Sequence, residues 1–267
     1  MKILFILLLA YIYYHFRKRV PILMYHRIAT VKGDRNSLPV EKFEEQMQYL
    51  EEKGFHSITM EQLESHILHG SPLPDKPIVL TFDDGYKDNV ETALPILKKY
   101  HQIGNVFSIA NWRGKENKWE NFGKELTVTM NDEELLQWQR EGNYIGSHTM
   151  DHPFLSECEP LRLRDELAQS KEVFDALTEK DVSCICYPYG DFNEEVIEEA
   201  KKCGYRLGLG IFYGVPLWKQ NPLALPRIPI PARQPMWEFK LKVSSIHLLF
   251  VWLRQMERTV KKKVRKL

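Results

Sequence analysis

The sequence predicts an α/β domain folded as a distorted, TIM-like (β/α) barrel of seven or eight strand–helix units. The chain has 267 residues, enough for one large domain, and its 43% hydrophobic and 27% charged residues are ordinary for a globular protein. Short β-rich runs alternate with helical patterns, and strands separated by helices pair in parallel. No internal repeat or low-complexity linker divides the chain. A barrel accommodates this many units, and a doubly wound open sheet is the alternative.

The expected elements follow one another in regular alternation. The expected strands are Pro21–Ile28, Phe55–Thr59, Ile78–Phe82, Asn105–Ala110, Tyr144–Ser147, Val182–Tyr187, Tyr205–Leu209 and Leu225–Ile230. The expected helices lie near Val40–Lys53, Met60–His69, Asn89–Tyr100, Asn131–Glu141, Pro160–Thr178 and Asn193–Cys203. In either architecture the chemistry belongs to the carboxyl ends of the strands, so functional residues are expected where these strands stop.

The first segment, residues 1–19, is expected to be an uncleaved membrane anchor. The apolar run Ile3–Tyr14 is followed closely by Arg17, Lys18 and Arg19. A spanning helix needs about twenty apolar residues, so this run fits a short span or an interfacial helix. A removed signal peptide is the alternative, although no small-residue cleavage site follows. Positive charge after the run favours a cytoplasmic position for the body of the chain.

The last segment, residues 236–267, is expected to be a basic amphipathic helix. Its apolar residues recur at spacings of three and four, namely Leu249, Leu253, Met256, Val260, Val264 and Leu267. The first twenty and last fourteen residues are basic, and 26 basic and 35 acidic residues remain between them. Basic ends on an acidic body predict contact with a membrane surface and argue against nucleic acid as a partner. A helix that packs on the body with a solvated end is the alternative.

The four cysteines are expected to be free and buried. They are Cys158, Cys184, Cys186 and Cys203, and no two form a CxxC pair. A structural zinc site of the CxxC type is therefore not expected. A disulfide is the alternative, and free thiols favour a reducing compartment.

Two adjacent carboxylates stand at the end of an apolar strand. Asp83 and Asp84 follow the run Ile78–Phe82 and precede Gly85. Adjacent carboxylates repel each other, and a metal ion or a proton relieves that repulsion. Gly85 allows a sharp turn at this point. Taken alone, the residues also fit a simple Asp-Gly turn beside a helix cap.

Two histidines follow another strand. His148 and His152 come just after Tyr144–Ser147 and are four residues apart, a spacing that lets both rings face one way. Imidazole suits zinc and other first-row divalent ions. One carboxylate and two imidazoles leave a coordination position open for water, as a catalytic ion requires. Two unrelated surface histidines are the alternative.

Three further groups are candidates for binding or catalysis. The turn after Val182–Tyr187 contains Pro188 and Gly190, and a rigid turn of this kind can aim a backbone N–H at an oxyanion. Tyr187, Pro188 and Trp112 are candidate substrate contacts, although Trp112 could equally pack in the core. His26 ends the first strand, where a lone histidine is usually structural.

These segments together resemble the polysaccharide deacetylase superfamily, the NodB-homology domains of carbohydrate esterase family 4. Thr81–Gly85, His148 with His152, and Tyr187–Gly190 stand in the order and rough spacing of its motifs. The opening PILMYH run from Pro21 to His26 resembles the branch of biofilm poly-N-acetylglucosamine deacetylases. The similarity covers roughly residues 21–230 and implies a catalytic domain over residues 20–235.

The resemblance also implies roles for individual residues. It makes Asp83 the general base, Asp84, His148 and His152 the metal ligands, the backbone N–H of Tyr189 the oxyanion donor, and His26 the catalytic acid. His26 enters because the order of the motifs is permuted in that branch. Many members carry an arginine that orients the base two residues before the proline of the third motif. Cys186 holds that position here, and the biofilm branch also lacks the arginine.

The implied function is metal-dependent N-deacetylation of N-acetyl amino sugars, with release of acetate. The substrate would be an N-acetylglucosamine polymer, peptidoglycan or a lipid-linked glycan, and the ion Zn²⁺, with Co²⁺, Ni²⁺, Mn²⁺ or Fe²⁺ as alternatives. The expected location is membrane-associated in a bacterial-type cell envelope, on either face. One alternative is a catalytically inactive, membrane-tethered glycan-binding protein. Another is a phosphotransferase with Asp83 as nucleophile, although such enzymes usually space their acids as Asp-x-Asp.

Overall fold

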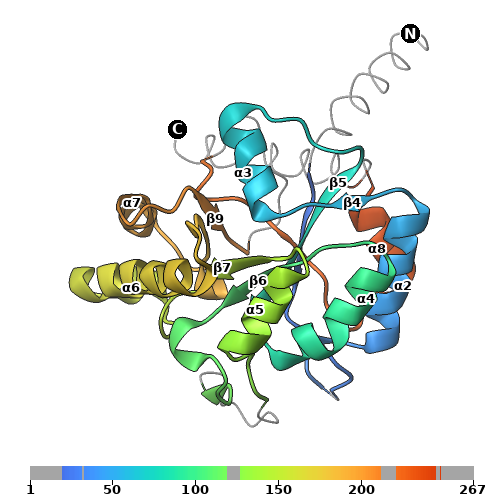
Figure 1. Ribbon diagram of the computed structural model, residues 1–267, viewed down its shortest axis with the longest axis horizontal. Coiled ribbons are helices and arrows are strands. Elements are labelled where there is room, and N and C mark those ends of the chain that lie inside the picture. The colour runs from blue at the N-terminus through green and yellow to red at the C-terminus, as the bar shows by residue number, and fades with distance from the viewer. Residues whose placement is uncertain (1–19, 32, 119–126, 212–220, 245–246, 248–267) are drawn as a thin grey trace, which may run out of the picture.

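The computed structural model describes residues 20–31, 33–118, 127–211, 221–244 and 247. Within them the chain forms an α/β fold in which helices surround a curled parallel sheet (Figure 1). The expected α/β class is therefore confirmed. The predicted anchor in residues 1–19 and nearly all of the predicted basic helix beyond residue 244 lie outside the described residues. Among the helices that the structure describes, none combines the length and the apolarity that crossing a bilayer requires.

The main sheet curls into a half-barrel. Its order is β10 (Ile228–Pro229), β1 (Ile22–Tyr25), β5 (Pro77–Asp84), β6 (Asn105–Ser108), β7 (Tyr144–Ser147), β8 (Cys184–Cys186) and β9 (Leu207–Leu209), with every neighbouring pair parallel. The strand β4 (His56–Ser57) pairs with the start of β5. Strand order rises steadily from β1 to β9 and β10 returns beside β1, whereas a doubly wound sheet would grow in both directions from its first strand.

One segment brings the two edges of the sheet toward each other. Leu225 bridges Leu209 at the end of β9, and three residues later Ile228 pairs with Leu23 in β1. The stretch before β10 therefore contacts both edges. This stretch also contains Arg227, whose side chain reaches Asp83 at the end of β5.

Several elements are shorter than the sequence predicts. The expected strand Pro21–Ile28 is interrupted at His26: β1 ends before it, and β2 (Arg27–Ile28) pairs instead with β3 (Ser37–Leu38). The expected helix over residues 89–100 begins with a π-helical turn, η1 (Asn89–Ala93), and continues as α4 (Leu94–Lys99). Both irregularities lie beside His26, because Asn89 donates a hydrogen bond of 2.8 Å to the His26 carbonyl.

The remaining helices follow the expected alternation with the strands. They are α2 (Val40–Glu52), α3 (Met60–His69), α5 (Asp132–Arg140), α6 (Pro160–Thr178), α7 (Glu194–Lys202) and α8 (Met236–Lys242), with 3₁₀ turns η2 (Ala110–Trp112), η4 (Leu155–Glu157) and η5 (Pro188–Gly190) between them. Reciprocal capping boxes join Thr59 to Gln62 and Asn131 to Glu134, which satisfies backbone donors at the starts of α3 and α5.

Side-chain alternation along β5 aims one of the two carboxylates into the half-barrel. Val79 packs in a cluster with Ile22, Phe107 and Leu207 from other strands. Leu80 and Phe82 instead belong to the cluster that the surrounding helices cover. Since successive side chains in a strand point to opposite faces, Asp83 lies on the interior side with Val79.

Candidate functional site

One carboxylate and two imidazoles meet at the carboxyl ends of β5 and β7. Asp84 Oδ1 lies 3.4 Å from Nε2 of His148 and 3.4 Å from Nε2 of His152. The three residues are 3%, 2% and 7% exposed, and their potential ligand atoms all lie within 4.8 Å of one another. Bonds from zinc to such ligands are near 2 Å, so an ion fits between these atoms. The structure thus brings together the three residues expected as metal ligands.

The backbone adopts uncommon conformations at this point. Asp84, Thr149 and His152 have φ values of 72°, 68° and 63°. A residue other than glycine pays about 1–3 kcal/mol for such a conformation, and this strain usually clusters at functional sites. Here it turns the end of β5 and the loop after β7 so that their side chains converge.

Two of the three groups have the protonation states that a cation needs. Burial would raise the pKa of the Asp84 carboxyl, but the imidazoles of His148 and His152 outweigh it and lower that pKa, so the group is a carboxylate. Burial, followed by the neighbouring His148, lowers the pKa of His152 to about 3, so its imidazole is neutral. A carboxylate and a neutral imidazole are the protonation states that bind metal ions.

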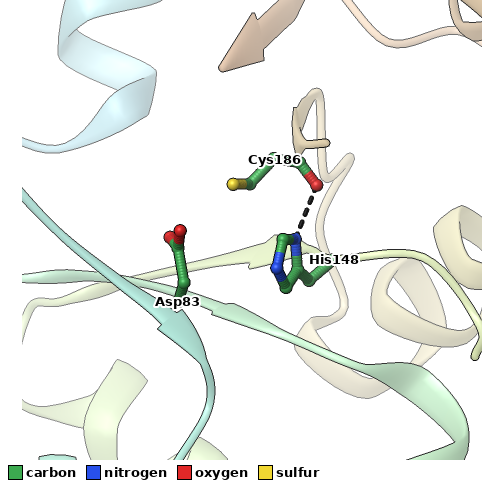
Figure 2. Close-up of side chains that lie close together, drawn as sticks. All are labelled: Asp83, His148 and Cys186. Atoms are coloured by element: carbon green, nitrogen blue, oxygen red, sulfur yellow. Dashed lines mark hydrogen bonds between the residues drawn. The ribbon is translucent and has the colours of Figure 1, made fainter. Parts of the chain in front are cut away.

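A hydrogen bond from Nδ1, the ring nitrogen away from Asp84, to the backbone fixes the orientation of the His148 ring. Its Nδ1 donates a hydrogen bond of 2.6 Å to the carbonyl oxygen of Cys186 (Figure 2). A carbonyl only accepts, so a proton sits on Nδ1. Burial would lower the pKa of His148, but Cys186, Asp84 and Asp83 outweigh it and raise that pKa, so an ion would have to displace a second proton from Nε2. This backbone contact is typical of histidines that ligate metals.

A second grouping shares His148 but suits an ion less well. Asp83, His148 and Cys186 also have potential ligand atoms within 4.8 Å of one another, and Figure 2 shows their side chains facing a common space. Burial raises the pKa of the Cys186 thiol, which opposes the thiolate that a metal needs. Both Asp83 oxygens already accept hydrogen bonds from a guanidinium. Of the two groupings, Asp84, His148 and His152 therefore suit an ion better.

That guanidinium belongs to Arg227, which the sequence analysis missed. Its Nη1 and Nη2 donate to Oδ1 and Oδ2 of Asp83 at 2.6 and 2.8 Å, and both side chains are almost completely buried. Burial would raise the pKa of the Asp83 carboxyl, but Arg227 outweighs it and the pKa is lowered. Nε2 of His26, half-buried, lies 4.0 Å from Asp83 Oδ2. A candidate base, its orienting cation and a candidate acid thus adjoin the ligand cluster.

Glu166 on α6 is a second residue that the sequence analysis missed. Its Oε2 accepts backbone hydrogen bonds from Met150 at 3.0 Å and Asp151 at 2.9 Å, inside the turn that joins His148 to His152. Glu166 is only 4% exposed, and burial raises the pKa of its carboxyl. An acid in the middle of an otherwise ordinary helix gives no sequence signal for this role.

The turn after β8 corrects two predicted substrate contacts. Tyr187 is fully buried and its hydroxyl donates to the Leu223 carbonyl at 2.9 Å, so its ring cannot meet a substrate. Pro188 is also buried. Strand alternation explains Tyr187, because it shares the outward face of β8 with Ile185. Tyr189 instead has a φ of 57°, is 44% exposed, and meets the His152 ring with centroids 4.5 Å apart.

Trp112 lies in a segment that is hydrogen-bonded to the turn between His148 and His152. The backbone N–H groups of Ala110 and Asn111 donate to the carbonyls of Thr149 and Met150 at 3.0 and 2.9 Å. Trp112 itself is half-buried. Its role as a substrate contact stays a prediction.

Comparison with known proteins identifies the family. The family model described as polysaccharide deacetylase matches residues 70–208. YxkH of Bacillus subtilis (strain 168), named as a polysaccharide deacetylase, is 31% identical over 212 residues, which are 79% of this chain and 71% of that protein. The poly-beta-1,6-N-acetyl-D-glucosamine N-deacetylase of Escherichia coli (strain K12) is 24% identical over 83% of this chain, which spans only 38% of its length.

Solved structures share the fold over most of the chain. The Streptococcus pyogenes deacetylase PplD, determined in complex with acetate, superposes with a TM-score of 0.75 at 23% identity, covering 85% of this chain and 98% of PplD. IcaB from Ammonifex degensii superposes with a TM-score of 0.71 at 21% identity, covering 85% of this chain and 97% of IcaB. At these identities the similarity establishes the fold alone.

Proposed function

Because the chain belongs to the polysaccharide deacetylase family, we propose that it hydrolyses the N-acetyl groups of amino sugars within a glycan and releases acetate. The observation that carries the proposal is the position of Asp84 Oδ1, 3.4 Å from both imidazoles, next to the buried pair of Asp83 and Arg227. Relatives named for poly-beta-1,6-N-acetyl-D-glucosamine and for peptidoglycan N-acetylmuramic acid support a polymeric substrate.

Asp84, His148 and His152 would hold a divalent ion, and we propose Zn²⁺ because two imidazoles and one carboxylate suit it. Such an ion, when bound, lowers the pKa of water and polarises a carbonyl oxygen. The hydrogen bond from His148 Nδ1 to the Cys186 carbonyl keeps the ring in the orientation that binding needs. The buried position of all three side chains limits competing water.

The remaining side chains move protons and stabilise charge. Asp83, held ionised by Arg227, accepts a proton from the water that attacks the acetamide carbon. The Tyr189 backbone N–H donates to the carbonyl oxygen as that oxygen becomes negative. His26 gives a proton to the sugar nitrogen as the carbon–nitrogen bond breaks. The products are acetate and a free amino sugar.

We further propose that the chain works at a membrane of a bacterial-type cell envelope, with the catalytic domain over residues 20–235. Support comes from the apolar run in residues 1–19 and from the basic residues after residue 253. Flotation of the full chain with anionic and with neutral vesicles tests this. We expect flotation with anionic vesicles, and a protein that stays at the bottom in both would contradict the membrane proposal.

Acetate release from N-acetylglucosamine polymers, measured enzymatically, tests the activity. We expect release by the purified full chain, its loss after treatment with a strong chelator, and its return on adding Zn²⁺. A verified metal-free protein with full activity would overturn the metal mechanism. A metal-loaded protein that releases no acetate from polymeric N-acetylglucosamine or peptidoglycan would overturn the proposed activity.

A further inference from the structure

Two exposed aromatic rings continue outward from the candidate metal ligand His152. The Tyr189 and His152 rings meet edge to face, with their centroids 4.5 Å apart. The Phe154 ring stacks on the Tyr189 ring, with centroids 4.1 Å apart and an angle of 13° between the ring planes. Phe154 is 47% exposed and Tyr189 44%. Large aromatic side chains are usually buried, so a stacked pair that leaves nearly half of each residue exposed offers apolar area to a ligand.

The two rings are held in place by their backbones. Phe154 directly precedes η4 and Tyr189 lies within η5. The Asp191 carboxylate ties these turns together, because it accepts 2.7 Å hydrogen bonds from both the backbone N–H and the hydroxyl of Ser156. A binding surface that is already ordered loses little conformational entropy when it meets a ligand.

The turn that carries Tyr189 also has little freedom to change. Gly190 has a φ of 66°, and a side chain there would place its Cβ 2.6 Å from the backbone nitrogen of Ile211. The backbone therefore fits only glycine at this position. It follows that the backbone carrying Tyr189 is held by packing rather than by a ligand.

We propose that Phe154 and Tyr189 form a binding surface for a pyranose ring of the glycan, adjacent to the sugar whose acetamide is hydrolysed. This inference rests on the proposed function. One face of a pyranose carries mainly C–H groups, which are attracted to the negative face of an aromatic ring, while the hydroxyl groups at the sugar's rim stay in water. The position of the stack, next to His152 and leading away from it, suits a neighbouring sugar.

A surface at Phe154 and Tyr189 would favour longer substrates over single sugars. A single N-acetylated sugar can contact the ion and the base Asp83 without reaching Phe154. An oligosaccharide can bind at the catalytic centre and also contact Phe154 and Tyr189 with its neighbouring sugar. The protein should therefore bind oligomers and polymers more tightly than isolated sugars, and Phe154 should be responsible for part of the difference.

Acetate release by Phe154→Ala, measured over N-acetylglucosamine oligomers from one to five units, tests the proposal. We expect KM for the longer oligomers to rise about twofold to tenfold, the range for aromatic contacts, with kcat unchanged and no effect on the monomer. Phe154→Tyr should restore the original KM. Leu161→Ala is the matched control, because Leu161 is a 72% exposed apolar residue on α6. An unchanged KM, or an equal rise for every length, would overturn the proposal.

A binding measurement separates this inference from the proposed function. The N-acetylglucosamine pentamer is titrated calorimetrically into Asp83→Asn protein, which is expected to hydrolyse it about 10²–10⁴-fold more slowly, with and without Phe154→Ala. We expect binding to weaken by a similar factor when Phe154 is removed. Binding that depends on Phe154, with no acetate released by the unsubstituted protein, overturns the activity and leaves the surface. Acetate release by the unsubstituted protein, with pentamer binding indifferent to Phe154, overturns the surface and leaves the activity.

Discussion

Asp83 and Arg227 form a two-pronged ion pair although 144 positions separate them in the chain. The Arg227 guanidinium is fully buried, and its Nε donates to the Gly210 carbonyl at 3.1 Å. Nη1 also reaches the hydroxyl of Thr81 at 3.1 Å. The arginine is therefore fixed by several groups, and through it the candidate base is fixed as well. The segment that leads into β10 thus supplies the cation beside the candidate base.

We predict that Arg227→Lys lowers kcat without weakening metal binding. Lysine keeps the positive charge but cannot make two parallel hydrogen bonds to one carboxylate. Losing a charge-assisted hydrogen bond costs about 1.5–3 kcal/mol, so kcat should fall about tenfold to a hundredfold. Steady-state kinetics and metal analysis check this. Arg206→Lys is the control, because Arg206 pairs with Glu64 and Asp181 at a 41% exposed position. Unchanged kcat in Arg227→Lys would contradict the orienting role.

Substitution of Asp83 and of Asp84 by asparagine should have different effects on metal binding and rate. Asp83→Asn should retain the ion and lose about 10²–10⁴-fold in rate, the usual contribution of a general base. Asp84→Asn should lose the ion, because a neutral amide replaces the one carboxylate of the ligand set. Metal content measured by atomic absorption, together with acetate release, separates the two. Circular dichroism is needed as well, since Asp83→Asn leaves the buried Arg227 without its counter-charge. Equal metal loss in both variants would contradict the division of roles.

Sequence patterns locate the ligand cluster because parallel strands end at one edge. Asp84 and His148 each follow a recognisable strand, so their convergence follows from the fold class. Arg227 could not be found in the same way, since its contact with Asp83 depends on how the curled sheet brings its two edges together. Tyr187 was misassigned for a simpler reason: it was grouped with its motif, whereas the two-residue period of β8 turns its ring away from the interior.

Glu166 should matter for metal affinity although it touches no ligand. In Glu166→Ala two part-buried backbone N–H groups, those of Met150 and Asp151, lose their acceptor, at about 1 kcal/mol each. The turn that sets His148 against His152 should loosen, and zinc affinity should fall about tenfold to a hundredfold, as when outer partners of ligands are removed. Competition with a chromophoric chelator measures this. Glu166→Gln keeps an acceptor oxygen and should retain most of the affinity, and equal affinities in all three proteins would refute the idea.

Ser108→Ala should stabilise the protein. The Ser108 hydroxyl is completely buried at the end of β6 and makes no hydrogen bond to any of the described residues. A buried polar group without a partner costs about 1–3 kcal/mol, so its removal should raise the free energy of unfolding, by about 1 kcal/mol. Urea denaturation checks the sign. Ser170→Ala is the matched control and should lower stability, because the equally buried Ser170 hydroxyl bonds to the Glu166 carbonyl at 2.7 Å. A less stable Ser108→Ala protein would show that the hydroxyl has a partner.

Four buried tyrosines predict loss of stability at alkaline pH. Burial raises the pKa of Tyr25, Tyr144, Tyr187 and Tyr205 above that of an exposed tyrosine. Above a pH of about 10 the unfolded chain releases these protons and the folded protein keeps them, so stability is complete below that pH and falls as the pH rises.

Each tyrosine that stays protonated only in the folded state adds about 1.4 kcal/mol per pH unit to the decrease in the free energy of unfolding. Urea unfolding between pH 8 and 11, followed together with phenolate absorbance, measures the slope. Tyr25→Phe removes one titrating group, whose hydroxyl donates to Gln46 at 2.9 Å, and should reduce the slope by one proton even if overall stability also changes. A free energy of unfolding that stays constant from pH 8 to 11 would mean that these hydroxyls reach solvent in the folded protein.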